Sequence, residues 1–136
     1  MQAIQAIKVL DALAVTGLGT GASNPILVED YDYVVISINT AGSYNGTVKV
    51  QGSIADAVPD FTASASPTNP WDYVQVRDLE DASALDGDVG FTAAGTDDNR
   101  LFKVNVDGLR WLALNQTARV AGSVTALVKG FKVSGE

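Results

Sequence analysis

Apolar and polar side chains alternate with a period of two along four stretches of the chain. These stretches are residues 32–39, 47–53, 71–78 and 123–131. A β-strand places successive side chains on opposite faces, so the alternation predicts strands with one buried face. The predicted buried positions are Val34, Ile36 and Ile38; Val48 and Val50; Val74 and Val76; and Val124, Ala126 and Val128.

Turn-forming residues separate these stretches. Glycine, proline, asparagine and aspartate gather at residues 41–46, 66–70, 86–88 and 107–108. Seven to nine short strands joined by such turns, with no helix predicted, are typical of an antiparallel sandwich or barrel. We predict an all-β, jelly-roll-like antiparallel β-sandwich, with an immunoglobulin-like Greek key as the open alternative. Residues 54–70, rich in Ala, Ser and Pro, predict a surface loop.

The first fifteen residues fit two structures. Ile7, Val9, Leu13 and Val15 share one strand parity, whereas residues spaced by three would line one side of a short helix. A glycine-rich hinge follows, so we divide the chain into an N-terminal arm and hinge (1–25) and a sandwich domain (26–136). An apolar arm either completes the sheet or packs on a neighbouring subunit. The residues predicted for a subunit interface are Ile4, Ile7, Leu10 and Leu13.

Asp107-Gly108 is the signature of a two-residue β-hairpin turn of type I′. If these residues form the loop, Val104 lies opposite Trp111. We therefore predict that Trp111 is a core residue and not a platform for a ligand. The predicted buried face carries only apolar residues, which would fix the register: Phe102, Val104, Val106, Leu109, Trp111 and Ala113.

The amino-acid composition limits the metal sites and catalytic groups that the chain can form. The 136 residues include no cysteine and no histidine, which excludes disulfides, thiolate or imidazole metal sites and Ser-His-Asp or Cys-His nucleophiles. Any catalysis would depend on carboxylates alone, and nothing in the sequence indicates two of them as a catalytic pair. We predict that the protein is not an enzyme and carries no cofactor.

Charge is acidic and unevenly distributed. The net charge of −7 argues against nucleic acid or an anionic membrane as the main partner. Residues 1–99 hold three basic and fourteen acidic side chains, a net −11, whereas residues 100–136 hold six and two, a net +4. The chain could therefore turn an acidic surface to solvent and a basic one to an acidic partner. We expect neither a signal peptide nor a membrane span.

Two groups of side chains are candidate binding residues. Trp71 and Tyr73 lie two residues apart near a predicted strand start, and could stack on a sugar or peptide or anchor the preceding loop. The segment 77–88 could bind calcium through carboxylates, but it lacks the EF-hand spacing, which favours a solvated loop. The carboxylates concerned are Asp78, Glu80, Asp81, Asp86 and Asp88.

Four segments resemble small β-sandwich virion proteins of tailed bacteriophages. They are VKVQGS (48–53), NPWDYVQVRDLED (69–81), RLFKVNVDGLRWLALN (100–115) and GSVTALVKGF (122–131). The likeness covers residues 30–131, and its motifs are structural ones. Residues 1–25 depart from the pattern, and no functional residue can be transferred from the family.

The resemblance implies a structural subunit on the outside of a phage capsid. The expected role is that of a decoration (cement) protein, and head fibres are related proteins. The expected partners are the major capsid protein and further copies of the chain in a homotrimer, with no nucleic acid, membrane or small-molecule substrate. The expected location is the capsid exterior, after synthesis in the host cytoplasm. The alternatives are a carbohydrate-binding or adhesion module using Trp71 and Tyr73, and a tail or baseplate component.

Overall fold

The computed structural model describes residues 6–17 and 20–133, and side chains from 20 to 132. The described residues form ten strands and no helix, and every strand pair is antiparallel. The all-β antiparallel prediction is confirmed. No helix that could cross a membrane is found in this part of the chain. The strands are β1 (Ala6–Gly17), β2 (Gly21–Ala22), β3 (Ile26–Leu27), β4 (Tyr33–Ser53), β5 (Asp72–Tyr73), β6 (Val76–Asp78), β7 (Ala84–Leu85), β8 (Phe91–Ala94), β9 (Arg100–Asn105) and β10 (Trp111–Val133).

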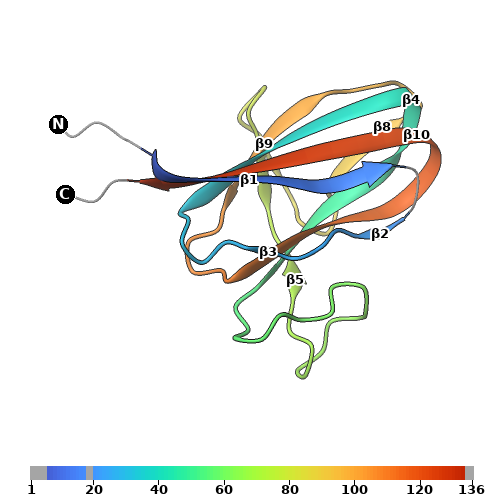
Figure 1. Cartoon of the computed structure of the whole chain (residues 1–136). Coiled ribbons are helices and arrows are strands. Elements are labelled where there is room, and N and C mark those ends of the chain that lie inside the picture. The colour runs from blue at the N-terminus through green and yellow to red at the C-terminus, as the bar shows by residue number, and fades with distance from the viewer. Residues whose placement is uncertain (1–5, 18–19, 134–136) are drawn as a thin grey trace.

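Two long strands, β4 and β10, pair along almost their whole length and bend together, so that each contributes to both layers of a sandwich (Figure 1). The first layer contains residues 33–41 of β4 and 123–133 of β10, flanked by β1 on one side and β9, β6 and β7 on the other. The second layer contains residues 45–53 and 111–121, flanked by β2, β3, β5 and β8. One continuous hydrogen-bonded sheet thus covers both sides of the core.

The bend is where a turn was predicted. Gly42, Ser43 and Gly122 have positive φ angles of 73°, 57° and 77°, and the two strands pass through the corner without reversing. A Cβ on Gly122 would lie 2.6 Å from the Ala41 carbonyl oxygen and from the Tyr44 Cα. The close approach and the positive φ both require glycine there. The predicted strands 32–39 and 47–53 are therefore one bent strand.

The core lies between the inner faces of the layers. Phe91 of the second layer meets Phe102 of the first, with ring centroids 5.7 Å apart. The predicted alternation is confirmed, except that Val74 is only partly buried. The remaining large buried side chains of the core come from both layers: Val34, Ile36, Ile38, Val76, Val104, Val106, Val124 and Val128 from the first layer and its adjoining turn, and Ile26, Val28, Tyr44, Val48, Val50, Leu112 and Leu114 from the second layer and its adjoining loop.

The predicted 107–108 hairpin is wrong. Leu109 donates a backbone hydrogen bond to the Val106 carbonyl, but only Gly108 has a positive φ (92°), whereas a type I′ turn needs two such residues. The strand pairings show that this turn takes the chain from the first layer to the second. β9 pairs with β4 and β6 in the first layer, and β10 begins beside Ser53 in the second. The side chains of Leu112 and Leu114 lie in the core. Trp111 has the opposite strand parity, so its side chain lies on the outer face of the layer, where it is half-buried.

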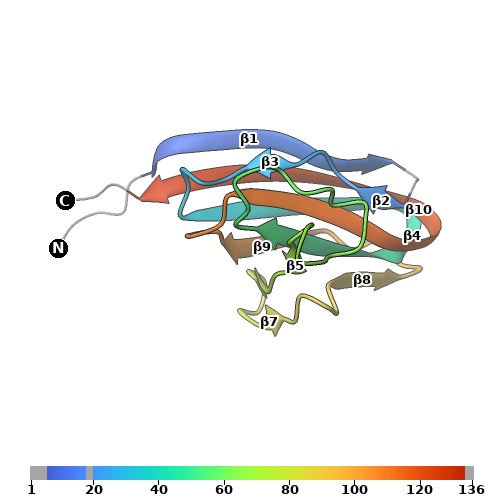
Figure 2. The same ribbon diagram turned by 90° about the horizontal axis from the view of Figure 1, so that it is seen from below.

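The N-terminal region runs beside β10 of the same chain. β1 pairs with β10 from Ala6 opposite Val133 to Gly17 opposite Val124, and β2 and β3 follow the remainder of β10 around the bend (Figures 1 and 2). For residues 6–15 the strand alternative is confirmed and the helix alternative is wrong. Ile4 lies outside the described residues. Among the residues that the structure describes, β1 pairs with β10 alone, which makes it an edge strand of the first layer.

Candidate interaction surfaces

The outer face of the second layer is covered by the predicted 54–70 loop. Figures 1 and 2 show this loop on the far side of the second layer from the core. Beneath it Gln51 and Ala113, which pair across β4 and β10, are fully buried. The Gln51 amide donates to the Phe61 carbonyl at 2.9 Å, and the Phe61 ring is 4% exposed. We call this surface the covered face.

Two tryptophans fasten the loop. The Trp71 indole N–H donates to the Ala63 carbonyl and the Trp111 indole N–H donates to the Ala55 carbonyl, each at 3.0 Å. Trp111 is thus structural, as predicted, but it anchors the covering loop from outside the main core. The Arg110 guanidinium lies 5.6 Å from its ring centroid and forms an ion pair with Glu29. Neither the burial under the loop nor this anchor could be found from strand periodicity.

The structure brings the predicted pair Trp71 and Tyr73 together. Their ring centroids lie 5.0 Å apart in an edge-to-face arrangement, and Phe61 lies 6.4 Å from Trp71. The Lys49 ammonium lies 5.0 Å from the Tyr73 centroid. A shallow hollow of about 560 Å³ beside Trp71 is lined by Ile54, Pro70, Trp71, Asp72, Val74 and Leu109, among others. The aromatic pair therefore anchors the loop and also borders an open hollow.

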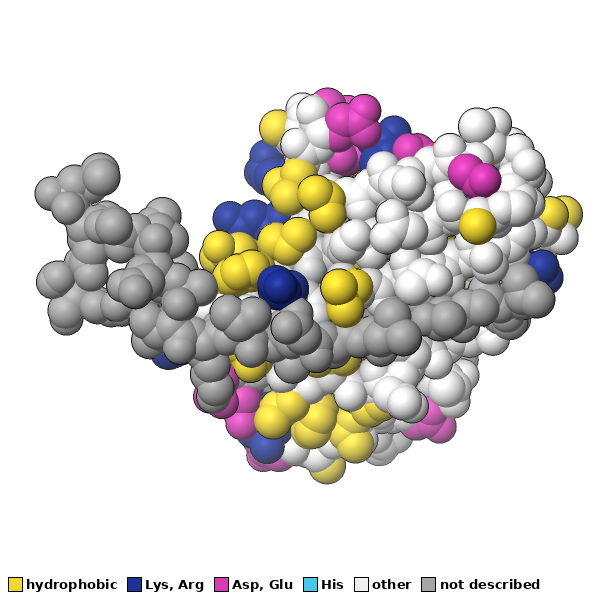
Figure 3. Space-filling view, turned by 45° about the horizontal axis from the view of Figure 1, so that its top comes forward, with side chains coloured by type: hydrophobic (Ala, Val, Ile, Leu, Met, Phe, Trp, Pro, Cys, Tyr) yellow, Lys and Arg dark blue, Asp and Glu magenta, His cyan; other side chains and the backbone are white. Residues whose placement is uncertain are grey.

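The outer face of the first layer keeps large apolar side chains in contact with solvent. Leu101 of β9 and Leu127 of β10 are 49% and 43% exposed, on either side of Ser37 of β4. Tyr33 and Phe131 stack with centroids 5.2 Å apart. Hydrophobic and basic side chains gather in the left half of the view in Figure 3. We call this surface the open face, defined by Tyr33, Val35, Arg77, Leu101, Lys103, Leu127, Lys129 and Phe131.

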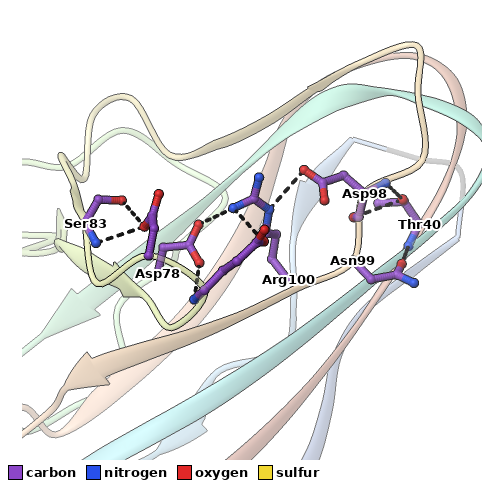
Figure 4. A network of polar contacts seen from close by, with 8 residues as sticks. Thr40, Asp78, Ser83, Asp98, Asn99 and Arg100 are labelled. Carbon is purple, nitrogen blue, oxygen red and sulfur yellow. Dashed lines mark hydrogen bonds and ion pairs between the residues drawn. The ribbon is translucent and has the colours of Figure 1, made fainter.

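An ion-pair network fixes one rim of the open face (Figure 4). Arg100, at the start of β9, contacts the buried carboxylate of Asp78 at 2.5 Å, Glu80 at 3.1 Å and Asp98 at 3.0 Å. The hydrogen bond with Asp98 is the largest of the causes that raise the pKa of Arg100 above its ordinary value. Thr40 of β4 exchanges hydrogen bonds with the Asp98 backbone. The network joins β4, β6 and β9 at this rim.

The carboxylates of the candidate calcium segment make separate local contacts. Asp78 binds Arg100, Asp81 accepts from the backbone N–H and hydroxyl of Ser83, and Asp86 accepts from the backbone N–H of residue 88. The hydroxyl of Ser83 lowers the pKa of Asp81. Within the residues described, no group of three or more acidic side chains is arranged to hold a metal ion.

Comparison with known proteins identifies a fold likeness. No protein-family model matches the chain, and no curated protein sequence matches it. The crystal structure of the SPBc2 prophage-derived protein YomS matches with a TM-score of 0.68 and 9% sequence identity. The match covers 93% of this chain and 94% of that one. This chain therefore shares the fold of YomS over most of the length of both chains.

Proposed function

We propose that this chain is a structural protein of a bacteriophage particle, bound to the outside of the capsid as a decoration protein. The observation that carries the proposal is the fold likeness, over 93% of this chain, to a protein of prophage origin, with a TM-score of 0.68. A decoration protein needs a stable scaffold and exposed contact surfaces, and the open face offers such a surface. Many weak contacts of this kind, repeated over a lattice, add up by multivalency.

The outer edge of β1 is a candidate contact between copies of the chain. An unpaired strand edge offers backbone N–H and C=O groups to a neighbouring strand. β1 carries Ile7, Leu10 and Leu13, and Ile4 precedes it. We propose that this edge contributes to a homotrimer whose stability depends on assembly. Under this proposal the partners are the major capsid protein and further copies of the chain, with no cofactor and no catalytic role.

The test is the location of the protein in purified particles. Phage particles from a host that carries this gene are separated into DNA-filled heads and tails, and each fraction is analysed by quantitative mass spectrometry and immunogold labelling. We expect the chain on the outside of heads, at a fixed ratio to the major capsid protein. Its presence only in the unassembled lysate would overturn the proposal. Labelling confined to tails would transfer the chain to the tail or baseplate alternative.

The hollow beside Trp71 favours a second candidate, a carbohydrate-binding module. The Trp71 ring would offer a stacking surface to a sugar, and the carboxylate of Asp72, which also lines the hollow, would accept its hydroxyl hydrogen bonds. The double variant Trp71→Ala and Tyr73→Ala should abolish glycan binding on an array if this candidate is correct. A decoration protein should lose stability and retain its capsid binding.

A further inference from the structure

A row of basic side chains crosses the open face. Arg77 of β6 lies opposite Lys103 of β9, Lys103 lies opposite Val35 of β4, and Val35 lies opposite Lys129 of β10. Neighbouring strands are about 4.8 Å apart. The row therefore crosses four adjacent strands, with a cation on β6, β9 and β10 and a valine on β4. Asp11 of β1 continues the row opposite Lys129, so the local reversal of the chain's net charge of −7 is concentrated at Arg77 and Lys103.

The row includes a pairing that works against folding. Like charges directly opposite one another in an antiparallel sheet are destabilising. Arg77 donates to the Ala82 carbonyl at 3.0 Å and Lys103 lies 4.4 Å from the Tyr33 ring centroid. Neither makes an ion pair with any residue that the structure describes. Local conflicts of this kind are expected at functional sites, where a partner supplies the missing opposite charge.

Apolar side chains and hollows flank the row. Leu101 and Leu127 lie on one side of it, and the stacked Tyr33 and Phe131 lie on the other. A shallow hollow of about 540 Å³ at the basic end is lined by Asp32, Tyr33, Val74, Gln75, Arg77, Lys103 and Asn105. A second hollow, of about 420 Å³, adjoins Leu101 and Leu79. Aromatic and arginine side chains are enriched at protein interfaces, and the exposed leucines add apolar area beside them.

We propose that the open face docks an acidic protein surface. Carboxylates of the partner lie opposite Arg77 and Lys103, and its apolar side chains lie against Leu101 and Leu127. A protein surface is favoured over nucleic acid, because the chain's net charge of −7 repels a polyanion, whereas a protein needs only a few carboxylates opposite the row. The identification of the partner as the outer surface of the capsid shell rests on the proposed function. The proposal that the open face binds an acidic protein surface rests only on the side chains of that face.

The first experiment tests the face alone. Backbone amide shifts of the full chain are followed by NMR during titration with a short synthetic peptide in which glutamate alternates with leucine. Single-stranded DNA is the second probe. We expect peptide-induced shifts centred on Val35, Leu101, Lys103 and Leu127, and weaker shifts with added salt. Shifts centred on the covered face, no shifts, or equally tight binding of DNA would each overturn the proposal.

The second experiment uses phage heads that lack the chain, prepared as in the test of function. The double variant Arg77→Glu and Lys103→Glu is compared with wild type and with Lys49→Glu, a charge reversal on the second layer. All variants must show the thermal unfolding of wild type. We expect the double variant to bind heads about tenfold more weakly or worse and Lys49→Glu to bind as wild type does.

The outcomes separate the two proposals. If wild type binds heads and the double variant binds equally well, the docking face is wrong and the proposed function stands. If wild type fails to bind heads while the acidic peptide shifts the open face, the proposed function is wrong and the docking face stands. If the double variant instead dissociates an oligomer of wild type, the occupant is a second copy, and the proposal of a separate acidic partner is wrong.

Discussion

The two outer faces of this sandwich share the same central pair of strands, yet one is covered and the other is open. On the covered face Gln51 and Ala113 are fully buried beneath a long loop. On the open face Leu101 and Leu127 remain 49% and 43% exposed. The difference comes from the connections, because β4 is followed by the 54–71 loop, which returns over the second layer and is fastened there by two indole N–H groups.

The contrast teaches how to interpret apolar residues on the outside of a sheet. Where the chain covers such residues itself, the aromatic side chains act as anchors, and their burial accounts for their presence. Where the chain leaves a group of adjacent apolar side chains open, as on the open face, the group is a candidate contact surface. The like-charge pair Arg77 and Lys103 occurs on the open face. Stability and binding are therefore expected to separate between the two faces.

The largest effect should come from the corner that joins the faces. Gly122→Ala places a Cβ 2.6 Å from the Ala41 carbonyl oxygen at a φ of 77°. Overpacking and backbone strain together should cost about 4 kcal/mol of unfolding free energy. Urea denaturation followed by circular dichroism measures it. Gly95→Ala is the matched control, because Gly95 has a φ of 90° with open space around it, and should cost only about 1–2 kcal/mol. Equal losses would show that the corner is not tightly packed.

A pair of truncations compares the faces directly. Phe61→Ala empties the space beneath the loop and should cost about 3 kcal/mol, with new protease cleavage between residues 54 and 71. Leu101→Ala removes an exposed side chain from the open face and should change stability by less than about 0.5 kcal/mol. Chemical denaturation and limited proteolysis measure both. A large loss from Leu101→Ala would contradict the view that the open face is dispensable for folding.

The inner faces of the sheet could be predicted from sequence, because burial on one side imposes a strict period of two. Val34, Ile36 and Ile38, and likewise Val124, Ala126 and Val128, are buried as their parity requires. The failures occur where the period gives no information. The residues at 41–46 have turn composition, but they form a bend, because a glycine on the partner strand, Gly122, allows the two strands to turn together.

The surfaces were harder to predict for a physical reason. Trp111 has an apolar side chain, and a hairpin that pairs it with Val104 predicts a core position. In the structure the chain changes layer between β9 and β10, and Trp111 lies beneath the covering loop. The open face depends on cross-strand register among β4, β6, β9 and β10, which no single stretch of sequence contains. The uneven charge did carry a usable signal: two of the three cations in the basic row, Lys103 and Lys129, come from the basic segment 100–136.

An effect smaller than those of Gly122→Ala and Phe61→Ala is predicted at the inner surface, where Tyr44 is buried and its hydroxyl donates to the Gln116 Oε1 at 2.6 Å. Burial raises the pKa of Tyr44 above its ordinary 10.0, although the charge of Arg119 opposes this in part. The folded chain therefore holds this proton to a higher pH than the unfolded chain, so the contribution is complete below the unfolded pKa and is lost as pH rises toward the folded pKa. Tyr44→Phe should cost about 1–2 kcal/mol at neutral pH, because Gln116 loses a hydrogen-bond donor. The gap between wild type and variant, measured by urea unfolding, should narrow as pH rises above about 10. A gap that stays constant across that range would mean that the hydroxyl ionises as readily in the folded chain as in the unfolded one.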